Sequence, residues 1–286
     1  MRIVQELAPH VDIEIESLYN EGAPPALNTR LHRFLRSKFP GGIKFDGGVH
    51  TPNQQPSGNA SFRIFATGEN ERPPEGKWDG YLTFDLHSFG GRNTYVPLWW
   101  ITCSDLILPT TAPYLGRELT LDQMLSPRVP EWEKRKKFCV AFIGKAWPFR
   151  MHAITALSRV GEVDVFGPVA RRSVESKYEI AQQYRFVFAF ENDLYPGYVT
   201  EKAPEAWGTG AVPLYWGADP EGYLNPGAMI NLAEYRTLED FVDHVAKVDK
   251  SKELWESLAS QPLLLRRPSP DEMIALLRKI LSPLCR

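Results

Sequence analysis

The chain has 286 residues, of which 43% are hydrophobic and 24% charged, and its formal net charge at pH 7 is -2. These values are typical of a folded protein with one large domain or two ordinary ones, and they exclude disordered, collagen-like and membrane-bundle classes. A charge so close to balance argues against a nucleic-acid-binding protein, which needs a basic excess or a basic stripe to neutralise phosphates.

The cysteine content and the absence of targeting patterns bear on the compartment. The three cysteines, Cys103, Cys139 and Cys285, are spaced for neither a disulfide framework nor a metal knuckle. Residues 1–15 lack the charged-then-apolar pattern of a signal peptide, and no segment reaches the roughly 20 apolar residues of a membrane helix. We therefore expect a reduced, cytoplasmic protein that is soluble or peripheral to the inner face of a membrane.

The first half of the chain reads as mixed structure. We predict a strand within residues 11–19, a helix over 25–39 and a long loop over 41–60, which is rich in Gly, Pro, Asn and Gln. Two further strands are predicted over 61–67 and 81–87, followed by an apolar run over 95–109. The charged, proline-bearing segment 126–137 is predicted to be a linker, which gives a first domain of residues 1–130.

The second half alternates strands with helices. Strands are predicted over residues 137–143, 163–166, 185–190, 212–216 and 229–232. Helices are predicted over 148–160, 173–183, 200–209 and 238–248, with two more beginning near Ser251 and Pro270. This alternation, with several apolar strands running directly into glycine, is the βαβ signature of a parallel sheet. Residues 131–268 are therefore predicted to form a second domain, followed by a C-terminal helix over 269–286.

Residues 188–216 carry the strongest functional signal. A buried strand ends at Phe190, and polar residues and a Pro-Gly turn lead into a helix for which Thr200 is a suitable N-cap. In a parallel sheet ligands bind beyond the carboxyl ends of the strands, and the free amides of a helix start together with the charge of Lys202 favour a bound anion there. A lysine in a first helical turn is also commonly a solvated surface residue, so spacing alone leaves both interpretations open.

This stretch resembles the donor-binding motif of the α-1,3-fucosyltransferases, which form glycosyltransferase family 10. The matching segments are Phe190-Glu191-Asn192, Tyr198-Val199-Thr200-Glu201-Lys202, Val212-Pro213 and Gly217. The match extends through a strand, a turn and a helix, so it is far more specific than a lone glycine pattern. Because the N-terminal membrane anchor of the animal enzymes is not seen, the chain resembles a soluble member of the bacterial type.

The resemblance implies roles for five residues of the second half. Lys202 and Tyr198 would contact the diphosphate of a GDP-sugar, and Glu201 and Asn192 would bond hydroxyls of the ribose or the sugar. Arg150, which follows the predicted strand over 137–143, would also reach the phosphates, since a guanidinium grips phosphate oxygens bidentately. Without the resemblance, the favoured interpretation of Arg150 is a surface arginine at a helix start.

Two further positions match the family. The segment Thr67-Gly68-Glu69-Asn70 lies where the family places its proposed catalytic base, which assigns that role to Glu69, with Glu71 as the nearest rival. A solvated turn carboxylate is the alternative for Glu69. Gly167, at the end of the predicted strand over 163–166, lies where the family has a glycine beside the nucleotide.

The resemblance implies an α/β fold of the GT-B type, with two Rossmann-like domains whose parallel sheets face a central cleft. Residues 1–130 would bind the acceptor and residues 131–268 the GDP-sugar donor. The helix over 269–286 would pack back onto the first domain; its amphipathic pattern leaves contact with an anionic membrane as the alternative.

The implied function is an inverting transfer of L-fucose from GDP-β-L-fucose to a hydroxyl of a glycan containing GlcNAc or glucose, in α-1,3 linkage. The alternatives are an enzyme of this fold that uses another GDP-sugar and a non-catalytic protein that binds a nucleotide or a glycan. No cofactor or metal is expected, because the chain has no Asp-x-Asp triplet and its six histidines are scattered. The expected partners are the GDP-sugar and the glycan, and no nucleic acid.

The first half also concentrates aromatic residues that could stack on sugars. These are Trp78, Tyr81, Tyr95, Trp99 and Trp100. Aromatic faces pack on sugar rings, so some of them are candidates for the acceptor site. Core packing is the favoured interpretation for Trp99 and Trp100, since large aromatic side chains supply much of the apolar area of a core.

Overall fold

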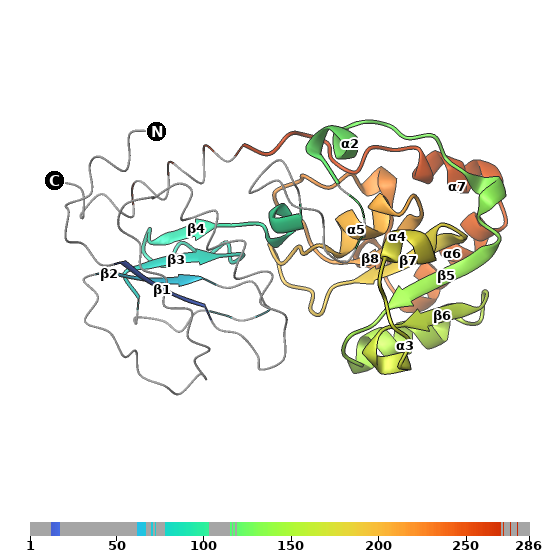
Figure 1. Cartoon of the computed structure of the whole chain (residues 1–286), viewed down its shortest axis with the longest axis horizontal. Coiled ribbons are helices and arrows are strands. Elements are labelled where there is room, and N and C mark those ends of the chain that lie inside the picture. The colour runs from blue at the N-terminus through green and yellow to red at the C-terminus, as the bar shows by residue number, and fades with distance from the viewer. Residues whose placement is uncertain are drawn as a thin grey trace. The chain divides into compact units, whose positions relative to one another are not determined.

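The computed structural model describes residues 13–17, 62–66, 70, 72, 78–102, 115, 117, 119–269, 271, 275 and 279. The chain divides into two compact units (Figure 1). The first comprises Met1–Ile101, Leu106–Leu108 and Ser269–Arg286, and the second Thr102–Asp105 and Pro109–Pro268. The predicted helix over 25–39, the loop over 41–60, Glu69, Glu71 and most of the C-terminal helix lie outside the described residues.

The first unit contains a parallel sheet with the strand order β1-β2-β3-β4. The strands are β1 (Ile13–Ser17), β2 (Phe62–Ala66), β3 (Gly80–Thr83) and β4 (Asn93–Tyr95). β3 is shorter than the predicted strand over 81–87. It ends because polar groups turn the chain: the Asp85 carboxylate accepts the His87 amide at 2.8 Å, and the Asn93 side-chain amide donates to the Asp85 carbonyl at 2.7 Å.

Aromatic side chains form the described core of the first unit. Phe65, Trp78 and Tyr81 are buried and pack together, and Phe89 stacks on Tyr81 with ring centroids 4.7 Å apart. Trp99 and its neighbour Trp100 lie in the 3-10 helix η2 (Leu98–Thr102) and are also buried. The burial of these aromatic residues therefore supports the interpretation that they pack in the core. Tyr95 differs from them, because it is half-buried.

The second unit contains a parallel sheet with the strand order β6-β5-β7-β8-β9. Its strands are β5 (Lys137–Phe142), β6 (Val163–Phe166), β7 (Tyr184–Phe190), β8 (Val212–Trp216) and β9 (Ile230–Asn231). Its α-helices are α2 (Leu121–Leu125), α3 (Pro148–Leu157), α4 (Lys177–Ala181), α5 (Lys202–Gly208), α6 (Leu238–Asp249) and α7 (Lys252–Ala259). Short 3-10 helices complete it: η3 (Trp132–Lys134), η4 (Pro168–Ala170), η5 (Pro226–Ala228) and η6 (Leu232–Glu234).

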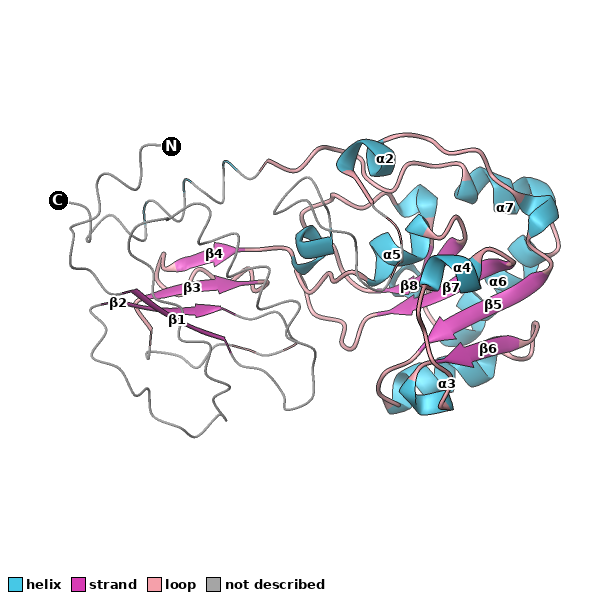
Figure 2. Ribbon diagram, viewed as in Figure 1, coloured by secondary structure: helices cyan, strands magenta, loops and turns pink. Residues whose placement is uncertain are grey.

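The side chains of β7 point alternately to the two faces of this sheet, and each face is covered by different elements (Figure 2). Successive side chains of a strand point to opposite faces. Phe186, Phe188 and Phe190 join the main core together with buried side chains of α3, α6 and α7. The intervening Val187 and Ala189 line a hollow beside α5 instead. The sheet is thus covered on both faces, which explains why its strands read as continuous apolar runs.

Pro213 occupies an unusual place in β8. A proline has no amide hydrogen and is normally confined to positions where a sheet has no neighbour to receive one. Pro213 pairs with Val187 of β7, while β9 begins to pair only one residue later, where Ile230 lies opposite Leu214. The proline therefore fits the sheet because β9 is so short.

Two arginines, the half-buried Arg128 and the buried Arg135, tie the segment that the sequence indicates as a linker into the second unit. Arg128 donates to the carbonyls of Trp207, Ala211 at 2.8 Å and Ala259 at 2.5 Å. The last carbonyls of a helix have no partner inside that helix, and a planar guanidinium can satisfy several of them. Burial lowers the pKa of Arg128 to about 9. Residues 126–137 are thus an integral part of the second unit, and the prediction of a linker there is wrong.

Arg135 also donates to backbone carbonyls, near the ends of α4 and α5. Its Nη1 donates to the carbonyls of Tyr184 at 2.7 Å and Ala181 at 3.1 Å, and its Nη2 donates to that of Thr209 at 3.0 Å. Burial lowers the pKa of Arg135 to about 10. The α2 helix is also fixed to this unit, since the Leu264 amide donates to the Met124 carbonyl at 3.0 Å. These contacts explain why the units divide between residues 101 and 109, before the boundary at 130 predicted from composition.

Gly167 ends β6 in a conformation that only glycine adopts without strain. Its φ is +100°, and a Cβ at this position would lie 2.7 Å from the Ile143 carbonyl oxygen. We expect Gly167→Ala to lower the free energy of unfolding by about 1–3 kcal/mol. Urea denaturation followed by fluorescence measures this. Gly144→Ala is the matched control, since a Cβ at Gly144 meets no atom within 4 Å; equal losses in both variants would contradict the assignment of strain to Gly167.

Candidate functional site

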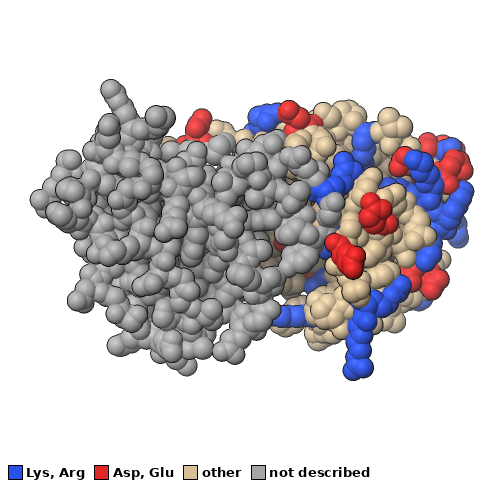
Figure 3. All heavy atoms as spheres, viewed as in Figure 1, with Lys and Arg blue, Asp and Glu red and all other residues tan. Residues whose placement is uncertain are grey.

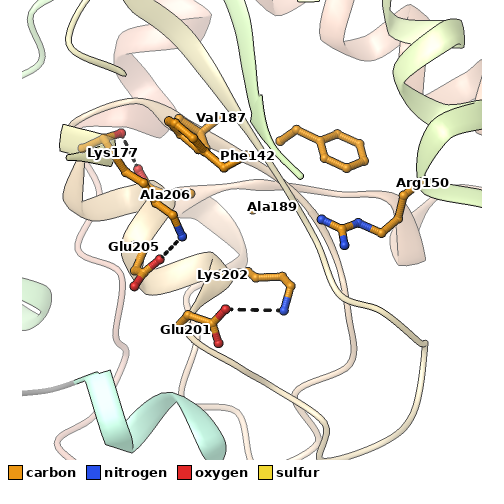
Figure 4. A pocket seen from close by; sticks show the side chains of 11 residues that line it. Phe142, Arg150, Lys177, Val187, Ala189, Glu201, Lys202, Glu205 and Ala206 are labelled. Carbon is orange, nitrogen blue, oxygen red and sulfur yellow. Dashed lines mark hydrogen bonds and ion pairs between the residues drawn. The ribbon is translucent and has the colours of Figure 1, made fainter. Parts of the chain in front are cut away.

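A hollow opens beyond the carboxyl end of β5 and beside α5 (Figure 4). The lining residues come from β5, β7 and the starts of α3, α4 and α5: Phe142, Arg150, Lys177, Val187, Phe188, Ala189, Glu201, Lys202, Glu205, Ala206 and Thr209. The site thus lies where parallel sheets bind ligands, and all of it belongs to the second unit.

Glu191 anchors the loop that leads into α5. It follows β7 directly, is completely buried, and its own amide donates to the Trp216 carbonyl at 2.9 Å. Its carboxylate accepts the Thr200 amide at 2.8 Å, the Thr200 hydroxyl at 2.7 Å and the Tyr215 hydroxyl at 3.3 Å. Burial raises the pKa of Glu191, while the charge of Lys202 and the Thr200 hydrogen bonds act in the opposite direction.

The Lys202 ammonium is held by this anchor. Its Nζ lies 3.1 Å from Glu191 Oε2 and 3.6 Å from Glu201 Oε1, and it donates to Thr200 Oγ1 at 2.9 Å. Burial by itself would lower the pKa of Lys202, but the two carboxylates outweigh it and raise that pKa well above its usual value. The side chain is 17% exposed. Lys202 is therefore a permanent cation at a fixed place in the pocket wall, and not a solvated surface lysine.

The start of α5 differs from the sequence prediction. Thr200 does not cap the helix, because both its amide and its hydroxyl are bonded to Glu191. The capping position is occupied by Glu201, without a side-chain hydrogen bond, and the helix begins at Lys202. Burial would raise the pKa of Glu201, but the positive charges of Lys202 and Lys177 lower it to about 2. Glu201 is thus an ionised carboxylate at the mouth of the pocket.

Arg150 faces the pocket from the first turn of α3. Its Nη1 donates to Asn192 Oδ1 at 3.0 Å, and its guanidinium carbon lies 6.0 Å from the centroid of the Phe188 ring. Only 6% of the residue is exposed, and its buried Nε has no hydrogen-bond partner among the described residues. A buried donor without a partner costs roughly 1–3 kcal/mol. Arg150 therefore carries one buried donor that the described residues leave without a partner.

Lys177 and Glu205 form an ion pair in the same wall, which sequence reasoning missed. Glu205 is 2% exposed and lies in α5, whereas Lys177 begins α4. Burial raises the pKa of Glu205 and the charge of Lys177 opposes that shift. Glutamates at 201 and 205 fall one turn apart, so the sequence places them on one helix face, but nothing in it indicates a lysine from another helix.

The remaining predicted residues divide between the site and its surroundings. Tyr198 is buried and interacts electrostatically with both Arg150 and Lys202, although it does not line the pocket itself. The structure thus brings four of the predicted donor residues together with Tyr198 beside them, whereas Glu69 lies outside the described residues.

Comparison with known proteins shows which family this part of the chain resembles. Residues 132–259, which contain the whole pocket, match the sequence profile of the C-terminal domain of glycosyltransferase family 10, the fucosyltransferases. The resemblance found in the donor motif is thereby confirmed.

Curated relatives of this family 10 domain carry fucosyltransferase names. The chain is 27% identical over 225 residues to the alpha-(1,3)-fucosyltransferase FucT of Helicobacter pylori, which covers 70% of this chain and 47% of that protein. It is 34% identical over 183 residues to a 4-galactosyl-N-acetylglucosaminide 3-alpha-L-fucosyltransferase of Gorilla gorilla gorilla, covering 60% of this chain and 45% of that protein. The chain therefore spans about half the length of these relatives.

Solved structures share the fold of this chain. A crystal structure of alpha1,3-fucosyltransferase with GDP has a TM-score of 0.70 and 23% identity, over 95% of this chain and 90% of that one. A crystal structure of the enzyme with GDP-fucose has a TM-score of 0.68 and 22% identity, over 99% and 93%. The α/β fold of the GT-B type, with two units that each contain a parallel sheet, is confirmed.

Three further observations describe the surface and the composition of the described residues. Within the described residues, His, Cys, Asp and Glu side chains form no group of three that could hold a metal ion. Over the same residues, no helix combines the length and apolar character needed to cross a membrane. Basic and acidic side chains are interspersed on the face of the second unit seen in Figure 3, so this face has no broad field of one sign.

Proposed function

We propose that the protein is an inverting fucosyltransferase that moves L-fucose from GDP-β-L-fucose to a hydroxyl of a glycan containing GlcNAc or glucose, in α-1,3 linkage. In this reaction the acceptor oxygen bonds to the anomeric carbon while the bond from that carbon to the diphosphate breaks. GDP leaves with the bonding electrons, and the acceptor proton goes to a base. The family assignment of residues 132–259 supports this proposal.

The single observation that carries the proposal is the pair of positioned cations in the family 10 domain. Lys202 is fixed by Glu191 and Thr200, and Arg150 is buried with an Nε that has no partner among the described residues. The leaving diphosphate gains negative charge in the transition state, and charges that are already in place stabilise it without reorganisation. We assign both cations to the diphosphate.

The other donor residues are assigned by their chemistry. The ionised carboxylate of Glu201 and the amide of Asn192 are suited to bond hydroxyls of the ribose or of the fucose, as the motif implies. The buried phenol of Tyr198 lies beside the two cations and completes the phosphate site. The cytoplasmic location, the membrane contact and the division of the chain into an acceptor and a donor domain remain predictions from the sequence.

Glu69 is assigned as the base that receives the acceptor proton. Its position after β2 follows from the family motif, and a carboxylate in this role contributes about 10²–10⁴-fold to the rate. We expect Glu69→Gln to lower kcat about 10²-fold and to leave the affinity for GDP unchanged, because the diphosphate is bound by the other unit. Steady-state kinetics and calorimetry measure the two quantities. A fully active E69Q variant would transfer the assignment to Glu71.

Product analysis tests the function as a whole. Wild-type protein is incubated with a glycan acceptor and either GDP-fucose or GDP-mannose, and the anomeric configuration and linkage of the product are read by NMR. The proposal requires an α-fucoside from GDP-fucose and little product from GDP-mannose. A mannosylated product would favour the alternative donor, and tight GDP binding without turnover on any acceptor would favour a non-catalytic binding protein.

A further inference from the structure

Among the described residues, one end of the pocket lacks a hydrogen-bond acceptor, and the other end lacks a donor. At one end the buried Nε of Arg150 lacks an acceptor. At the other end the ammonium of Lys177 pairs with Glu205 Oε2, while Glu205 Oε1 is buried and has no hydrogen-bond partner among the described residues. Both ends line the same hollow, and Figure 4 shows the Lys177–Glu205 pair on the opposite side of Lys202 from Arg150.

The unsatisfied oxygen of Glu205 needs an explanation in this location. A buried polar atom without a partner costs about 1–3 kcal/mol, and more when the group is charged. A structural ion pair between helices would be more stable with both carboxylate oxygens bonded. In the wall of a pocket, a carboxylate oxygen held in this way is suited to accept a hydrogen bond from a bound N–H or O–H group.

A nucleoside diphosphate matches this polarity along its length. Its phosphates are acceptors and would lie at Arg150 and Lys202. Its base is the part that carries N–H donors. We propose that Lys177 and Glu205 read the base of the donor and select guanine, an inference that rests on the proposed function.

The arrangement of donor and acceptor in the pair fits guanine better than the other common bases. The edge of guanine presents the O6 acceptor, then the N1–H donor, then the N2 amino donor. The Lys177 ammonium faces O6, and the Glu205 carboxylate receives the N–H groups. Adenine presents a donor where Lys177 requires an acceptor. Uracil presents a second carbonyl, O2, where Glu205 requires a donor.

Xanthosine diphosphate makes the test specific, because xanthine carries a carbonyl where guanine carries the N2 amino group. Wild-type protein should bind GDP about 10- to 100-fold more tightly than XDP or ADP, because each of these bases replaces a group that the Lys177–Glu205 pair can bond with one of the opposite hydrogen-bonding character. In E205Q the amide group can accept from N1–H and donate to the xanthine carbonyl. We expect the ratio of GDP to XDP affinity in E205Q to fall at least tenfold, with XDP binding stronger than in the wild type.

Two further variants keep the test informative if E205Q folds poorly. The double variant K177M/E205Q removes both charges together, so no buried charge is left alone, and it should also lose the preference for GDP over ADP and XDP. D249N breaks the Arg185–Asp249 ion pair, which is half-buried and lies elsewhere in the same unit. It is the matched control and should keep the wild-type ratios. Calorimetry with GDP, XDP, ADP and UDP measures all of them.

The outcomes separate this inference from the function on which it rests. If wild-type protein prefers GDP and E205Q keeps that preference unchanged, Glu205 does not read the base, and the fucosyltransferase proposal stands. A loss of affinity in E205Q that is equal for all four nucleotides would assign the pair to the ribose and overturn the inference. If wild-type protein does not distinguish among the nucleotides, both the inference and the GDP-sugar donor are overturned.

Discussion

Replacing Lys202 with alanine should lower kcat/KM for GDP-fucose by about 10³-fold, since removal of one preorganised donor to a developing anion typically costs 10²–10³ in kcat and binding weakens as well. The affinity for GDP, measured by calorimetry, should fall with it. The physical reason is that the Lys202 ammonium is charged under all ordinary conditions and is fixed by Glu191 and Thr200. Because the side chain is already held in place, Lys202 loses little conformational entropy when it binds a diphosphate.

A second effect of Lys202→Ala has to be separated from the first. The substitution leaves the buried carboxylate of Glu191 without its counter-charge, and breaking a buried pair in this way costs about 3–5 kcal/mol of stability. The double variant K202M/E191Q removes both charges and should recover much of the stability while still failing to bind GDP. Lys134→Ala, which changes an exposed lysine, is the control. GDP affinity equal to that of the wild type in K202M/E191Q would remove Lys202 from the phosphate site.

Replacing Arg135 with methionine should lower the free energy of unfolding by about 4 kcal/mol, because it leaves buried carbonyls without donors at roughly 1–3 kcal/mol each. The affected carbonyls belong to Ala181, Tyr184 and Thr209. Urea denaturation measures the loss, and the similarly sized substitution Lys134→Met at the exposed neighbour should change stability by less than about 0.5 kcal/mol. Comparable losses in both variants would show that the Arg135 hydrogen bonds carry little of the stability.

A second substitution, Gly210→Ala, tests the role of the Arg135 guanidinium independently. Gly210 has φ +85°, and a Cβ there would collide with the Nη2 atom of Arg135. Gly210→Ala should therefore also destabilise the second unit, both by its backbone strain and by displacing the guanidinium. A stable G210A variant would mean that the guanidinium can move without consequence.

The strands of the second unit were predictable because their signals are local. β6 and β8 have the predicted limits, 163–166 and 212–216, since each is a short apolar run that ends in Phe-Gly or Trp-Gly. Helix ends were less well predicted. α5 begins at Lys202 and not at Thr200, because the polar groups of Thr200 are bonded to a glutamate nine positions earlier in the chain.

The failures concern contacts between distant parts of the sequence. The segment over 126–137 has the charge and the proline content of an exposed linker, but Arg128 and Arg135 find carbonyl partners as far along the chain as Ala259. In the same way, Lys202 and Arg150 could be assigned from a motif and a strand end. The pairing of Lys177 with Glu205 joins two helices, and no pattern within either one predicts it.

The proline in β8 also limits the last strand of the sheet. If β9 were extended backwards along β8, it would come to lie opposite Pro213, which has no amide hydrogen to donate. Pro213 thus sets the point from which β9 can begin to pair.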